Sequence, residues 1–142
     1  MLVGLMGAVG IAVESPESVW FYDLNHNRQV PAEAVVGRLK DARVVVVGEK
    51  HTVVGHHEAQ LNVIRMLHES GTQVAVGLEM FRAESQEALD RWVAGDMSDD
   101  AFQQVYFDNW NFPWTLYDDI FLYARDRKIP GAIFSTISKS CR

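Results

Sequence analysis

The sequence has almost no cysteine and little positive charge, and each shortage excludes a class of protein. Cys141 is the single cysteine among 142 residues, so a disulfide framework and a thiolate metal cluster are both excluded. Any metal must therefore be bound through nitrogen or oxygen. The 13 Lys and Arg against 19 Asp and Glu give a net charge of −6. Without a basic surface to neutralise phosphates, we expect neither nucleic acid nor an anionic membrane as a partner. The expected partner is therefore a small molecule or another protein.

The sequence also lacks a hydrophobic run long enough to span a membrane. The apolar start, residues 1–13, is shorter than the roughly 20 residues that a transmembrane helix needs. It is typical of the apolar part of a secretory signal, but no Lys or Arg precedes Arg28, so a mis-set start or a cloning remnant is the alternative. We assign residues 1–18 to a signal remnant or apolar lead, and residues 19–142 to a single domain. Export follows only if the lead is a signal; otherwise the chain is cytoplasmic.

The composition is that of a folded globular domain, with 48% hydrophobic and 23% charged residues. Residues 19–30 predict a β-hairpin around a polar turn at 25–27. Pro31 suits the first turn of a helix, and we expect a short amphipathic helix through Lys40. Its inward residues are predicted to be Ala34, Val35 and Leu39.

The centre of the chain predicts an α/β fold with a parallel sheet. Val44–Val47 are four consecutive β-branched residues, a pattern typical of a strand buried on both faces. Residues 56–70 have helical periodicity and residues 74–78 predict a second strand. Strand, helix and strand form a βαβ unit, which places the two strands parallel.

The remaining chain predicts a run of helices and one further strand. Helices are expected at 84–93, 99–107 and 114–127, separated by Gly95 and Pro113. A third strand is expected to begin at Ile129-Pro130, but residues 131–142 contain only one short apolar stretch and are otherwise polar. We therefore expect an incomplete, truncated domain, from a frameshift, a premature stop or a shortened gene product.

Three polar side chains follow the predicted strands of this sheet. Glu49 and His51 come directly after the first strand and Glu79 after the second. Open parallel sheets bind ligands at the carboxyl ends of their strands. Glu49 and His51 are two apart, so they point to the same side and form a carboxylate–imidazole pair suited to metal ligation or to general-base work. The alternative is that all three have structural roles. Glu49 would then cap the amides of the next helix, His51 would be an ordinary loop residue, and Glu79 would form an ion pair with Arg82.

Two further histidines, His56 and His57, stand at the start of the next helix. The helix dipole disfavours a charged imidazolium there, which keeps the ring nitrogens free as ligands. The alternative is one histidine facing solvent and one on the apolar face. His68 lies about three turns further along and is interpreted as structural.

Aromatic residues are concentrated in one stretch. Nine of the fifteen lie between Phe102 and Tyr123, and Trp114, Tyr117 and Phe121 share one helix face. Such a stripe usually packs a core, but it could also line a porphyrin pocket, and a tyrosinate is a known ligand of ferric haem.

Several of these strings occur in the order and spacing of a known family. VVVVGEKHTVVGHHEAQ, VAVGLEMF, the glutamine of ESQEALDRW and WNFPWTLYDDIFLYA resemble the ChaN-like haem-binding proteins, over roughly residues 19–130. The resemblance implies an α/β core related to the erythromycin-esterase group, an exported or membrane-attached setting, and a link to iron acquisition. It also implies haem bound between the protomers of a homodimer.

By position, the resemblance assigns haem contacts to His51, His56, His57, Trp110, Trp114 and Tyr117. A metal would be bound by Glu49, His51 and Glu79. The leading hypothesis is therefore a haem-binding protein rather than an enzyme. The alternatives are a metal-assisted hydrolase in which Glu49 and His51 activate water, and an inactive truncated domain. The chain lacks a lipobox cysteine, which leaves a lipid anchor unsupported.

Overall fold

The computed structural model describes residues 20–133. The predicted signal remnant or apolar lead and most of the expected C-terminal tail lie outside the described residues. Among the described helices, none combines the length and the apolar character needed to cross a bilayer.

The N-terminal hairpin is confirmed. Strand β1 (Trp20–Asp23) pairs antiparallel with β2 (Arg28–Pro31). In the turn, Asn27 has a positive φ of 48°, a conformation that asparagine tolerates better than most residues. Asp23 stabilises the turn because its carboxylate accepts hydrogen bonds from the backbone amides of Asn25 and His26. Local polar side chains thus specify this part of the fold.

Helix α1 (Ala32–Leu39) follows Pro31, as predicted. Its burial differs from the prediction, because Ala34 is exposed and Val35 and Leu39 are only half-buried. The helix contacts the hairpin and α2, and these neighbours do not enclose any of its residues fully.

The predicted strand at Val44–Val47 is wrong. This segment has no assigned strand, and Val44 and Val46 are 69% and 87% exposed. The parallel pair is instead β3 (Val76–Leu78) with β4 (Gly131–Ile133). A β-branched run needs a neighbouring strand to complete its hydrogen bonds, and among the described residues no strand lies beside 44–47.

The helices agree with the prediction more closely. Helix α2 (Val54–Glu69) precedes β3, and a short helix η1 (Ala83–Ser85) continues into α3 (Gln86–Ala94). They are followed by α4 (Asp99–Asn109), by η2 (Trp114–Leu116) and by α5 (Asp118–Asp126). The α/β class is confirmed, with small sheets.

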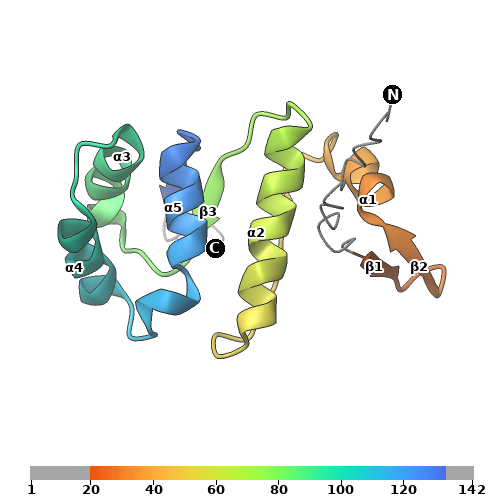
Figure 1. Cartoon of the computed structure of the whole chain (residues 1–142), viewed down its shortest axis with the longest axis horizontal. Helices are drawn as coiled ribbons and strands as arrows, with labels where there is room; N and C mark the ends of the chain where they lie inside the picture. Colours follow the sequence, from red (N-terminus) through yellow and green to blue (C-terminus); the bar gives the residue numbers. More distant parts are fainter. Residues whose placement is uncertain (1–19, 134–142) are drawn as a thin grey trace, which may run out of the picture.

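The aromatic stretch forms the core. Phe102 is fully buried, and its ring stacks on that of Trp92 with centroids 4.2 Å apart. Trp114 stacks on Phe121 at 5.3 Å. In Figure 1, helices α3, α4 and α5 gather on one side of β3, while α2 lies on the other side and separates it from α1 and the hairpin. The core thus lies between β3 and the three later helices, next to the carboxyl end of β3.

Gln86 connects this core to the sheet through two hydrogen bonds. Its Nε2 donates to the carbonyl of Gly131, and its Oε1 accepts from the amide of Ile133. One side chain at the start of α3 therefore bonds to two backbone groups of β4.

Candidate functional site

The carboxylate of Glu49 is the centre of a cluster of polar side chains. Its side chain is only 9% exposed. Oε1 is hydrogen-bonded to Nδ1 of His51 and accepts a bond of 3.0 Å from the hydroxyl of Tyr117. Oε2 lies 3.4 Å from Nδ1 of His57. Three elements therefore meet at one carboxylate: the segment after Val47, the first turn of α2, and the start of α5.

A turn at the start of α2 sets the position of His51. The backbone amide of Lys50 donates to Nδ1 of His56 over 2.8 Å, and the amide of Val53 donates to the carbonyl of Lys50 over 2.8 Å. His56 is therefore an acceptor at Nδ1 and carries its proton on Nε2. In this arrangement His56 is exposed and shapes the turn that carries His51.

His57 is the buried member of the cluster, at 4% exposure. Its Nε2 donates to the carbonyl of His51 over 3.2 Å, and its ring packs on Tyr117 with centroids 4.2 Å apart. Neither Nδ1 of His57 nor Oε2 of Glu49 has a well-directed hydrogen bond to a described residue. These two buried atoms face each other at 3.4 Å.

Tyr117 supports the cluster from the core. It is 2% exposed and belongs to the buried aromatic cluster with Tyr106 and Phe121. Burial, followed by the hydrogen bond to Glu49, raises the pKa of Tyr117 above its ordinary value. The phenol therefore stays neutral and donates to the carboxylate.

The imidazole of His51 packs against two aromatic rings. Trp110 meets it edge-on at a centroid distance of 5.0 Å, and Phe112 lies at 4.7 Å. The side chain remains 37% exposed, and its Nε2 makes no hydrogen bond to a described residue. His51 thus offers one free nitrogen to a ligand beside two aromatic rings, which also contact each other with centroids 5.4 Å apart.

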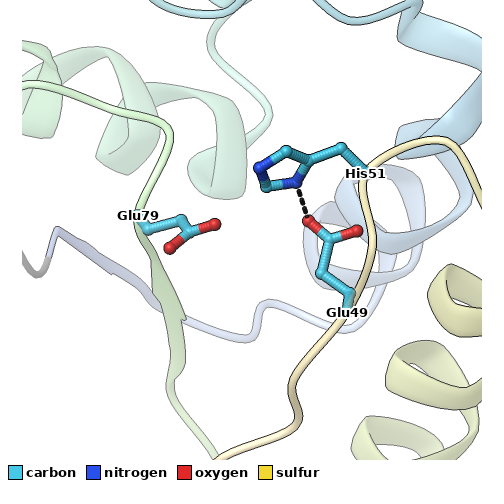
Figure 2. A group of neighbouring side chains, drawn as sticks. All are labelled: Glu49, His51 and Glu79. Carbon is cyan, nitrogen blue, oxygen red and sulfur yellow. Dashed lines mark hydrogen bonds and ion pairs between the residues drawn. The ribbon is translucent and has the colours of Figure 1, made fainter.

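Glu79, just beyond β3, faces this imidazole from the other side, as Figure 2 shows. One ligand atom each from Glu49, His51 and Glu79 lie within 4.8 Å of one another, a spacing that could hold a metal ion. Arg82 is not the partner of Glu79 among the described ion pairs, because its guanidinium donates to the carbonyl of Asp108 over 2.8 Å. The three predicted metal ligands therefore do come together.

The remaining predicted residues have different positions. Trp114 packs inside the core against Phe121 and Phe102, and no contact with His51 occurs among the described residues. His68 donates to or accepts from the hydroxyl of Tyr123 at 3.1 Å, in agreement with a structural role.

Sequence reasoning missed Phe112 as a contact of His51, although its place two residues after Trp110 was an available signal. Gln60, one turn after His56, donates to the carbonyl of Val47 over 3.3 Å and so holds the segment before Glu49 against α2.

Comparison with known proteins gives a family match. A family model described as "Haem-binding uptake, Tiki superfamily, ChaN" matches residues 35–134, which is more than half of the chain. No curated protein and no solved structure matches the chain significantly. The matched range contains every residue of the cluster.

Proposed function

The chain belongs to the haem-binding uptake family of the Tiki superfamily, ChaN, and on that premise we propose that it binds haem through Nε2 of His51. Family membership supports haem binding in general, and the individual ligand is our proposal. The observation that carries it is the hydrogen bond between Glu49 and Nδ1 of His51.

This hydrogen bond prepares the imidazole for a metal. A carboxylate acceptor keeps the proton on Nδ1, so that the lone pair of Nε2 points outward as a ligand, and it makes that nitrogen more basic. Tyr117 and His57 hold Glu49 in place from two sides. The imidazole therefore has little freedom to rotate away from an incoming iron.

The surroundings of His51 fit an iron porphyrin. Trp110 and Phe112 pack against the imidazole, and aromatic rings stack favourably on a flat conjugated macrocycle. When bound, haem would supply a Lewis-acidic iron. In this proposal His51 would hold the iron, Trp110 and Phe112 would contact the ring, and His56 and Tyr117 would position the cluster without touching the metal.

Titration with hemin tests the ligand. The wild-type chain is expected to shift the Soret band to that of a histidine-ligated haem, and His51→Ala is expected to abolish this shift. His26→Ala is the matched control, because His26 is an exposed imidazole in the hairpin and its loss should leave the spectrum unchanged. A His51→Ala variant with the wild-type spectrum would refute the proposal.

We further propose that two copies share the haem, as a step in iron uptake. A side chain that is 37% exposed leaves one face of the ligand site open, and a second protomer could cover it. Light scattering of the eluted protein should give twice the chain mass with hemin and the single mass for His51→Ala. Equal masses in both samples contradict the shared site.

A divalent metal is the second candidate, favoured by the convergence of Glu49, His51 and Glu79. If the chain is a hydrolase, Glu49, His51 and Glu79 would hold the metal, which would supply Lewis-acid activation of water. Glu79→Gln should then abolish binding of Zn²⁺ or Mn²⁺ measured by calorimetry, whereas Glu84→Gln, an exposed carboxylate on η1, should not. An ester-substrate panel with these metals tests the activity. Hemin binding that survives Glu79→Gln separates the two candidates.

A further inference from the structure

A second polar cluster lies where α2 packs against α5, away from Glu49. Its centre is Tyr123 on α5, whose hydroxyl is hydrogen-bonded to Nδ1 of His68 on α2 over 3.1 Å. His68 and His57 belong to the same helix, and His68 stands about three turns, or roughly 16 Å, further along its axis. This cluster is therefore separate from the candidate site.

Two arginines lie against the ring of Tyr123. The guanidinium carbon of Arg65 is 5.3 Å from the ring centroid and that of Arg127 is 5.6 Å, within the range of a cation–π interaction. The described ion pairs of arginine belong to Arg38 and Arg125, so neither of these two guanidiniums has a carboxylate partner among the described residues. Both side chains are exposed, and their donors are accessible to a ligand.

The neighbouring carboxylates do not neutralise this pair of charges. Glu69 follows Arg65 by four residues on α2, a spacing at which ion pairs form across a helix turn, but no such pair occurs among the described ion pairs. Asp126, next to Arg127, is paired with Arg125 over 3.1 Å. Two like charges therefore share one ring, and an anion bound between them would relieve their repulsion.

The hydrogen-bonded pair of His68 and Tyr123 adds a donor to the cluster. Either the hydroxyl donates to Nδ1, which leaves the imidazole proton on Nε2, or Nδ1 donates to the hydroxyl oxygen, which leaves the hydroxyl proton free. Among the described residues, these two side chains make no other hydrogen bond. In both tautomers one N–H or O–H beside the arginines is available to an acceptor.

A hollow of about 580 Å³ adjoins the cluster. His68 and Arg127 line it, together with residues 71–75, which lead into β3, and residues 129–130, which lead into β4. It therefore lies at the opposite end of β3 from Glu79. None of the described residues that line it carries a carboxylate, although the chain has 19 acidic residues. The lining thus favours a negative ligand, and the volume is within the range of small-molecule sites.

The turn that carries Arg127 is held by its neighbour. Lys128 has a positive φ of 56°, a conformation that is uncommon for a residue with a side chain and persists only where its surroundings hold it. Its Nζ donates to the carbonyls of Val93 and Ala94 over 3.0 and 2.8 Å, at the end of α3. Lys128 therefore secures the turn, and Arg127 is left to meet a ligand.

We propose that Arg65 and Arg127, with the His68–Tyr123 pair, bind the phosphate group of a small molecule. A phosphate monoester is close to a dianion at neutral pH, which matches two fixed positive charges. The planar donor forks of the guanidiniums suit its several oxygens. The rest of the ligand would occupy the adjoining hollow. The inference does not depend on haem binding.

Calorimetric titration of the intact chain with phenyl phosphate tests the site. Ionic strength is kept constant, because salt screens exposed charges. The wild-type chain is expected to bind phenyl phosphate more tightly than benzoate, which carries one negative charge. Arg65→Gln and Arg127→Gln are each expected to weaken binding about tenfold, through the loss of a charge-assisted hydrogen bond. Arg28→Gln is the matched control, because Arg28 is an exposed arginine on β2, and its affinity should equal that of the wild type.

Three results would overturn the proposal. The first is a wild-type chain that binds no phenyl phosphate while both variants melt at a lower temperature, which would give the arginines a packing role between α2 and α5. The second is equal affinity in the wild type and both variants, which would place the anion elsewhere. The third is equal affinity for benzoate and phenyl phosphate. If Arg65→Gln does not fold, Arg127→Gln, just after α5, decides the question.

Discussion

The hydroxyl of Tyr117 donates a 3.0 Å hydrogen bond to Glu49, although 68 residues separate the two in the sequence. The phenol ring lies in the aromatic core and the carboxylate lies in the site. This bond therefore joins the stability of the core to the geometry of His51, and it leads to the first prediction.

Tyr117→Phe should lower the free energy of unfolding by about 2 kcal/mol, because it leaves a buried carboxylate without one of its donors. Urea denaturation followed by fluorescence measures this change. Tyr22→Phe is the matched control: its hydroxyl bonds to Asn27 at an exposed position, so its loss should change the free energy little. Equal effects of the two substitutions would contradict the role given to Tyr117.

The second prediction concerns alkaline pH. Burial is the main cause that raises the pKa of both Tyr106 and Tyr117 above the ordinary value. The unfolded chain ionises these tyrosines near pH 10 while the folded chain does not, so stability is present below that pH and is lost as the pH rises above it. Chemical denaturation at pH 8, 10 and 11 should show this decline.

A variant with both substitutions, Tyr106→Phe and Tyr117→Phe, should start less stable and decline less between pH 8 and 11. A decline as steep as that of the wild type would assign the alkaline loss to other groups.

The third prediction concerns acidic pH and the hairpin. The hydrogen bond from Arg38, followed by that from His26, lowers the pKa of Asp23 below its ordinary value. A lowered pKa contributes stability that is present above about pH 4 and is lost as the pH falls below it. The melting temperature of Asp23→Asn should therefore lie below that of the wild type at pH 6, and the difference should shrink toward pH 2. A constant difference would contradict this linkage.

The fourth prediction compares two glycines. Gly95 ends α3 with a φ of 84°, and a Cβ there would meet Nζ of Lys128 at 3.2 Å. Gly95→Ala should cost about 1–2 kcal/mol, because the left-handed conformation disfavours a side chain. Gly37 lies within α1 and has open space around it, so Gly37→Ala should stabilise the chain by about 0.5–1 kcal/mol. Thermal or urea unfolding of both variants should show a lower free energy of unfolding for Gly95→Ala and a higher one for Gly37→Ala.

Local signals in the sequence predicted much of the fold. The turn residues at 25–27 located the hairpin, Pro31 located the start of α1, and Gly95 located the end of α3. Each acts on its own neighbours through backbone conformation or hydrogen bonding. The convergence of Glu49, His51 and Glu79 was also predictable, because it follows from where each stands after an apolar run.

What could not be predicted depends on distant partners. Val44–Val47 has the composition of a buried strand, but no neighbouring strand is present among the described residues to complete it. Trp114 and Tyr117 belong to one aromatic stripe, yet the ring of Trp114 packs in the core while the hydroxyl of Tyr117 reaches Glu49. Periodicity gives the face of a helix but not the neighbour that it meets.

The long separation between Tyr117 and Glu49 also constrains how the chain folds. Contacts between residues far apart in sequence form slowly, because a large loop must close before they exist. The carboxylate can be held from both sides only after α5 has docked against α2. A competent His51 would therefore be among the last features to mature, and the onset of hemin binding after dilution from denaturant would time the final step of folding rather than an early collapse.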